Sequence, residues 1–215
     1  LESREFFVTA SIGIALSPQD GNELSQLMKN ADTAMYHAKE RGKNNFQFYS
    51  ADLNAEAMRF FQLEQKLRHA VGNRELVLYY QPQVDIATGR LVGAEALVRW
   101  IDPEEGVISP GRFIPVAESS GVIGQLGQWV IREACQQGQR WRDADLPEIT
   151  LAVNISPRQF HLTDVAGCAA QALADSGFPP RCLEFELTET ALAERPEEAR
   201  QVLLHLQQLG LRTAV

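Results

Sequence analysis

The segment Gly93-Ala94-Glu95-Ala96-Leu97-Val98-Arg99-Trp100 decides the fold, because it is a strand whose two faces differ in chemistry. Side chains along a β-strand point alternately to opposite sides of the sheet. Around this segment one side is wholly apolar, whereas the other carries Glu95, Leu97 and Arg99. The apolar side is expected to pack against helices, which leaves an acid and a base on the opposite side of the sheet.

Working outward from this segment, short apolar strands alternate with amphipathic stretches of helical length. This order is typical of parallel strands in an α/β fold. Residues 211–215 are expected to begin another strand. The predicted strands are Leu76–Gln81, Leu91–Trp100, Ile149–Ser156 and Leu183–Thr188, and the predicted helices are Val122–Trp141, Asp164–Ser176 and Pro196–Leu209.

Polar side chains recur towards the carboxyl ends of these strands. Asn154 and Glu186 occupy such positions, and Gln81 ends the first strand. A (β/α)8 barrel places its active site at this edge of its sheet. Glu95, Asn154 and Glu186 offer oxygen ligands alone, which suits Mg²⁺ or Mn²⁺. The guanidinium of Arg99 is a natural bidentate partner for phosphate.

Each of these residues also has a purely structural interpretation. A Glu or Arg on a strand is usually solvated or ion-paired, and Asn154 could end its strand by bonding to backbone groups. Strand spacing alone therefore leaves the functional and structural interpretations both open.

The N-terminal part has a different organisation. A strand over Val8–Leu16, an apolar helical stripe from Leu24 to Ala38 and a short strand over Asn45–Tyr49 form a piece too small for an independent domain. Residues 50–72 are expected to form a polar helical connector. Its apolar side is predicted to consist of Leu53, Ala57, Phe60, Phe61, Leu63 and Leu67.

Composition excludes several classes of protein. The net charge of −8 argues against binding to duplex DNA or RNA, whose phosphates require a basic face. The three cysteines show no Cys-x-x-Cys pair and are expected to be reduced, which indicates a cytoplasmic protein. No run approaches the ~20 apolar residues of a membrane span. Whether an upstream segment tethers the protein to a membrane stays open.

With these residues in view, the chain resembles the EAL-domain family of cyclic di-GMP phosphodiesterases, preceded by the end of a GGDEF domain. The first resemblance covers residues 60–215. It is carried by Tyr80-Gln81-Pro82-Gln83-Val84, Gly93–Trp100, Ile108-Ser109-Pro110, Phe113-Ile114-Pro115-Val116-Ala117-Glu118, Val153-Asn154-Ile155-Ser156 and Glu186-Leu187-Thr188-Glu189.

The resemblance implies metal-dependent hydrolysis of cyclic di-GMP, a bacterial second messenger, to linear pGpG. It implies that Glu95, Asn154 and Glu186 bind Mg²⁺ or Mn²⁺. Gln81, Leu97 and Arg99 would contact the substrate, with Arg99 on a phosphate. Glu189 would anchor a loop near the catalytic centre, so that Glu95 and Glu189 are the expected catalytic residues. Ser109, Pro110 and Glu118 also match family positions, and we interpret them first as packing and turn-setting residues.

The N-terminal resemblance is to the last strand and helix of a GGDEF cyclase domain. The loop that names that family is absent, so cyclase activity is not expected, and Lys39 and Lys43 are interpreted as surface charges. We expect residues 1–49 to be the end of a GGDEF domain, residues 50–62 a linker and residues 63–215 the first part of an EAL barrel. Upstream sensory domains and a homodimer formed through the EAL domain are further implications.

Two other functions stay open. A degenerate EAL domain could bind cyclic di-GMP as a receptor without cleaving it, and a structural regulator could bind proteins alone. The intact set of Glu95, Asn154, Glu186 and Arg99 favours the enzyme. In the family, an Asp-Asp pair follows the helix expected at Pro196–Leu209, and later strands supply Lys, Glu and Gln. The present chain ends at Val215, before these groups.

A complete barrel needs roughly 250 residues, whereas residues 60–215 number 156. We therefore expect this polypeptide alone to be inactive, with an open barrel, or to be one stretch of a longer molecule. A turnover assay with cyclic di-GMP and Mg²⁺ on this polypeptide measures the point directly. Clear formation of pGpG would contradict the expectation.

Overall fold

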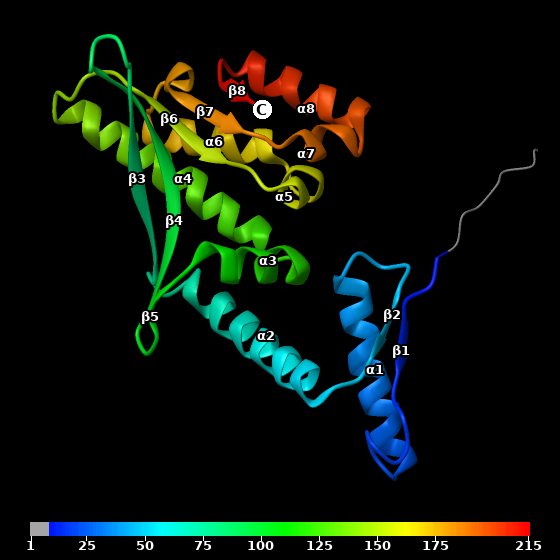
Figure 1. The fold of residues 1–215 in the computed structure, drawn as a ribbon. Helices are drawn as coiled ribbons and strands as arrows, with labels where there is room; N and C mark the ends of the chain where they lie inside the picture. Colours follow the sequence, from blue (N-terminus) through cyan, green and yellow to red (C-terminus); the bar gives the residue numbers. More distant parts are fainter. Residues whose placement is uncertain (1–8) are drawn as a thin grey trace, which may run out of the picture. The chain divides into compact units, whose positions relative to one another are not determined.

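The protein is described by a computed structural model that covers residues 9–215, with the side chains at positions 40, 53, 54, 56 and 57 outside the description. The chain divides into two compact units, Leu1–Leu63 and Glu64–Val215. The division falls within helix α2 (Ala51–Ala70) (Figure 1). The predicted connector over residues 50–72 is therefore helical, as expected. Its predicted apolar members Leu53 and Ala57 lie outside the described side chains.

The first unit contains the predicted strand–helix–strand piece. Strand β1 (Ile12–Ile14) and strand β2 (Phe46–Phe48) pair in parallel, and helix α1 (Leu24–Glu40) connects them. The first strand is shorter than predicted, and Val8 lies outside the described residues. Gly13 is required where α1 approaches β1, because a Cβ there would overlap the carbonyl oxygen of Ala31.

The second unit is built on one mixed sheet, so the predicted α/β class is confirmed. The strand order is β3-β4-β6-β7-β8, and β5 pairs with the far end of β4. From β4 to β8 the neighbours in this order run parallel. The bounds are β3 (Leu76–Val84), β4 (Leu91–Asp102), β5 (Gly106–Ile108), β6 (Thr150–Asn154), β7 (Leu183–Glu186) and β8 (Arg212–Ala214).

Strand β3 departs from the parallel arrangement that the strand–helix alternation predicts. It pairs with β4 as an antiparallel hairpin. The connection between Val84 and Leu91 is too short for the crossover that parallel strands require. Asp85 closes the turn by accepting a hydrogen bond from the backbone N–H of Thr88 at 2.8 Å.

Helices cover the apolar side of this sheet. The predicted long helices are present within one or two residues of their expected bounds, whereas α3, α5 and α7 were not predicted. Two of these are short, and α3 contains Pro115 in its interior. The helices of the second unit after α2 are α3 (Pro110–Ser120), α4 (Ile123–Asp143), α5 (Pro157–Leu162), α6 (Val165–Ser176), the 3₁₀ turn η1 (Pro180–Cys182), α7 (Glu189–Ala193) and α8 (Pro196–Gln208).

The alternation in β4 produces the core of the second unit. Ala94, Ala96 and Trp100 are buried on one side of the strand, and Trp100 packs edge-to-face on Phe113 of α3 at 5.7 Å. On the other side, Gly93 leaves room for the side chain of Gln83, because a Cβ at position 93 would lie 2.6 Å from the Gln83 Oε1. Among helices in the described part of the chain, none is long and apolar enough to cross a membrane.

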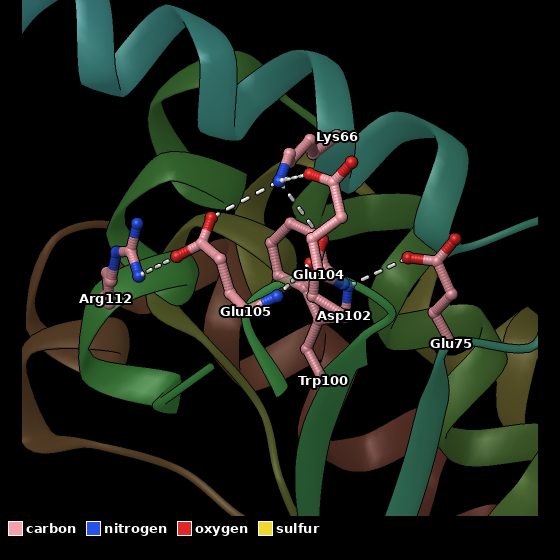
Figure 2. Close-up of polar contacts among 7 residues, drawn as sticks. All are labelled: Lys66, Glu75, Trp100, Asp102, Glu104, Glu105 and Arg112. Atoms are coloured by element: carbon pink, nitrogen blue, oxygen red, sulfur yellow. Dashed lines mark hydrogen bonds and ion pairs between the residues drawn. The ribbon is translucent and has the colours of Figure 1, made fainter. Parts of the chain in front are cut away.

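A polar cluster fixes the end of β4 (Figure 2). Asp102 is 5% exposed, and one of its oxygens accepts hydrogen bonds from the backbone N–H groups of Glu105 and Glu104 at 2.7 and 2.8 Å. The Lys66 ammonium lies 3.5 Å from the other oxygen. The hydrogen bond from Glu105, together with the second N–H and the Lys66 charge, lowers the pKa of Asp102. The ionised carboxylate therefore stabilises the turn between β4 and β5.

We predict that Asp102→Asn lowers the free energy of unfolding at pH 7, because the folded state favours the ionised form. A lowered folded-state pKa gives stability that is complete above the ordinary value of 3.8 and is lost as the pH falls through the lowered value. Urea unfolding from pH 7 down to pH 3 should show the difference from wild type shrinking below pH ~4.

Glu104→Gln is the matched control in the same turn. Its side chain is 81% exposed and contacts Lys66 at 3.1 Å, so its loss should change stability little. An Asp102→Asn penalty that stays constant across this pH range would contradict the prediction.

Candidate functional site

Strand alternation and register bring the predicted polar residues to one face of the second sheet. Glu95 lies directly opposite Gln81 of β3 and, on its other side, opposite Ala152 of β6. Asn154 lies one pleat further along β6 and pairs with Glu186 of β7. Since residues paired in register share a face, these side chains line the surface opposite the helix-covered core.

Glu95 and Asn154 are in direct contact. The Asn154 side-chain nitrogen donates a hydrogen bond to Glu95 Oε1 at 2.6 Å. This bond aligns two of the three predicted metal ligands and leaves the amide oxygen of Asn154 outside the bond. The Asn154 side chain thus binds Glu95 across the sheet, and its role as a metal ligand stays a prediction.

Glu186 is half-buried, as is Glu95. Burial raises the pKa of Glu186, and the nearby negative charges of Glu95 and Glu184 raise it further. The carboxylates thus repel one another across the sheet in the protein alone. A cation placed between them would reverse this unfavourable interaction.

The donor set fits a hard divalent cation. It consists of two carboxylates and one amide oxygen, which match the ligand preference of Mg²⁺ and Mn²⁺. Within residues 9–215, no group of three or more His, Cys, Asp and Glu side chains is placed to hold a metal ion. The third member of the predicted set is the amide of Asn154, and the metal-binding role of the set stays a prediction.

A cavity of about 340 Å³ adjoins these residues. Residues from both sides of β4 line it together with Asn154 of β6, and residues of α3, α4 and α5 line it from the helices. The residues of β4 are Ala96, Leu97, Val98 and Arg99. In the described residues, the Arg99 guanidinium donates to the Val98 carbonyl at 2.9 Å, and no carboxylate lies within ion-pair distance. Its charge is therefore available to an anion.

For the other predicted residues, the structure shows no direct polar contact with Glu95, Asn154 or Glu186 in its described part. Glu189 is exposed at the first position of α7, whose N-cap is Thr188, and its loop-anchoring role stays a prediction. Pro110 and Glu118 line the cavity beside Arg99, whereas Ser109 directly precedes α3. Our interpretation of these three as packing and turn-setting residues stays a prediction.

The sequence interpretation missed Tyr79. It lies opposite Leu97 in the β3–β4 register, and its ring centre is 5.6 Å from the Arg99 guanidinium carbon. Its position two residues before Gln81 was the available signal, because residues two apart on a strand share a face.

Comparisons with known proteins identify the families to which the two parts of the chain are similar. A model of the EAL domain family matches residues 64–215, and a model of the diguanylate cyclase GGDEF domain family matches residues 1–45. The chain is 40% identical over 211 residues to the bifunctional diguanylate cyclase/cyclic di-GMP phosphodiesterase MucR of Pseudomonas aeruginosa. It is 39% identical over 206 residues to the cyclic di-GMP phosphodiesterase PdeR of Escherichia coli. These alignments cover 98% and 96% of this chain but 31% of each relative.

Solved structures share the fold of the second unit. A structure of the PaMucR phosphodiesterase in a c-di-GMP complex matches with a TM-score of 0.69 and 37% identity, over 72% of this chain and 62% of that chain. The FimX EAL domain of Xanthomonas citri, in complex with c-diGMP, matches with a TM-score of 0.66 over 74% of this chain and 62% of that chain. At 24% identity, this second match supports the fold alone.

We predict that Glu186→Gln raises the midpoint of thermal unfolding in the presence of EDTA at pH 7. The folded state disfavours the ionised form of Glu186, so an uncharged side chain of the same shape relieves a repulsion. The same variant should lose stabilisation by added Mg²⁺ or Mn²⁺. Differential scanning calorimetry with and without each ion measures both effects.

Glu148→Gln is a control of opposite sign. The hydrogen bond from Arg181 lowers the pKa of Glu148, so its replacement should not raise the unfolding midpoint. Equal effects of the two substitutions, or an unchanged metal response in Glu186→Gln, would contradict the assignment.

Proposed function

The second unit of this chain belongs to the EAL-domain family, and from that membership we propose that the protein carrying it hydrolyses cyclic di-GMP to linear pGpG. The convergence of Glu95, Asn154 and Glu186 beside Arg99, which has no ion pair among residues 9–215, carries this proposal. The two relatives are described as cyclic di-GMP phosphodiesterases, and the solved PaMucR structure is a complex with the same dinucleotide. Since the chain spans 31% of those relatives, activity and substrate are proposals for the whole protein.

The arrangement of the site supports a different role for each of these residues. Glu95, Asn154 and Glu186 would hold Mg²⁺ or Mn²⁺, which when bound neutralises phosphate charge and acidifies water. Arg99 would bind a phosphate oxygen through its fork of N–H donors. Gln81, opposite Glu95, and Leu97, in the cavity wall, would orient the dinucleotide. We retain Glu189 as a residue that positions the loop after β7.

The hydrogen bond between Asn154 and Glu95 supports this assignment. Asn154 donates to one oxygen of Glu95, and the other oxygen would act as a ligand or as a proton acceptor. The register places Glu186 beside Asn154, one pleat beyond Glu95, which brings a second carboxylate to the same face. A purely structural face would gain nothing from placing these acids together, because they repel.

Further organisation is part of the proposal. We retain residues 1–49 as the end of a GGDEF domain, residues 50–62 as a linker and residues 63–215 as part of the EAL domain. Upstream sensory input, homodimerisation through the EAL domain and a cytoplasmic location remain predictions. The match of residues 1–45 to the GGDEF family supports the first of these assignments.

The test is hydrolysis by the full-length protein that carries this chain. With Mg²⁺ or Mn²⁺, wild type should convert cyclic di-GMP to pGpG, measured by chromatography of the products. Glu95→Gln should lower kcat by about two orders of magnitude, the scale for loss of one electrostatically stabilising group. EDTA should abolish turnover and excess Mg²⁺ restore it.

Glu133→Gln is the matched control. Glu133 lies on the exterior helix α4, paired with Arg140 at 2.6 Å, and its substitution should leave turnover unchanged. Binding of cyclic di-GMP without any pGpG would instead identify a receptor, and absence of binding would support a structural regulator. Either result would overturn the hydrolase proposal.

A further inference from the structure

The antiparallel hairpin brings a residue outside the predicted set to the site. Tyr79 and Leu97 are register partners, and Gln81 and Glu95 are the next partners on the same face. Tyr79 therefore shares its face with Glu95, Leu97 and Arg99. This placement follows from the antiparallel register of β3 and β4.

The ring of Tyr79 contacts the group proposed to bind phosphate. The guanidinium carbon of Arg99 lies 5.6 Å from the ring centre, within the range of a cation–π interaction. The other contact of this guanidinium in the described chain is its own neighbour, the Val98 carbonyl. Two groups thus hold the guanidinium, one through a hydrogen bond and one through the ring face.

Tyr79 and its neighbour Tyr80 point to opposite faces of the sheet. Tyr80 packs on Trp141 at 4.7 Å, whereas the ring of Tyr79 lies against the Arg99 guanidinium. An aromatic ring also leaves the N–H donors of the guanidinium edge free.

We infer that Tyr79 is a positioning residue for Arg99, and that its ring holds the guanidinium in place for a phosphate of the bound dinucleotide. The inference rests on the proposed function of the site. The ring reduces the conformational entropy that Arg99 loses when it binds, because the side chain is already ordered. It leaves the positive charge intact, which a carboxylate partner would neutralise.

The chain offers a matched pair of substitutions. Tyr79→Leu removes the ring and keeps an apolar side chain, and Tyr79→Phe keeps the ring and removes the hydroxyl. In the full-length protein with Ca²⁺, which suits oxygen ligands, the Kd for cyclic di-GMP is measured by calorimetry. Tyr79→Leu should raise Kd about two- to fivefold, the range of an exposed cation–π contact. Tyr79→Phe should keep the Kd of wild type.

A double-mutant cycle separates positioning from direct contact with the nucleotide. In an Arg99→Met background, Tyr79→Leu should have no further effect on Kd, because the ring then has no cation to hold. If Tyr79→Leu weakens binding equally in both backgrounds, the ring acts on the dinucleotide itself and the inference is overturned. It is overturned as well if Tyr79→Phe fails to keep the Kd of wild type.

A measurement without ligand separates this inference from the proposed function. The ring current of Tyr79 should shift the side-chain proton resonances of Arg99, and the shift should vanish in Tyr79→Leu and persist in Tyr79→Phe. Loss of all nucleotide binding by wild type, with this shift present, would refute the proposed function. Absence of the shift in wild type would refute the positioning role whatever the protein binds.

Discussion

The pairing of β4 with β3 on one edge and β6 on the other is the constraint on which the second unit depends. Because the side-chain period of a strand is two, a slip of one residue would turn Glu95 into the helix-covered core and expose Ala94 and Ala96. The buried indole of Trp100 on the same strand opposes any such slip, since its nitrogen donates to Glu75 at 3.1 Å. The apolar side of β4 therefore determines which groups reach the site.

The charged side chains on the inner face of the sheet lower the stability of the fold locally. A barrel interior is normally filled by bulky branched side chains, yet here the row through Glu95 continues across the sheet with Ala152, Glu184 and Arg212. Burial and like charges raise the pKa of Glu186 in the next row. Proteins tolerate such unfavourable placements mainly where the chemistry requires them.

Alternation and spacing were sufficient to predict the α/β class, the long helices and the convergence of Glu95, Asn154 and Glu186. They could not predict the antiparallel direction of β3, because direction depends on the length and closure of the turn at Asp85. Helix α3 was missed because its interior proline conflicts with the usual helical signal. Tyr79 was missed for a related reason, since its partner Arg99 lies on a different strand and the diagonal contact depends on register.

Gly93 of β4 has no side chain, and this lets β3 and β6, which run in opposite directions, both approach β4 closely at this position. A Cβ there would lie 2.6 Å from the Gln83 Oε1 and 3.0 Å from the backbone oxygen of Thr150. The glutamine can withdraw, whereas the Thr150 carbonyl belongs to the sheet and cannot. The Thr150 carbonyl therefore restricts position 93 to glycine whatever side chain stands at position 83, and the space above Gly93 remains open to that side chain.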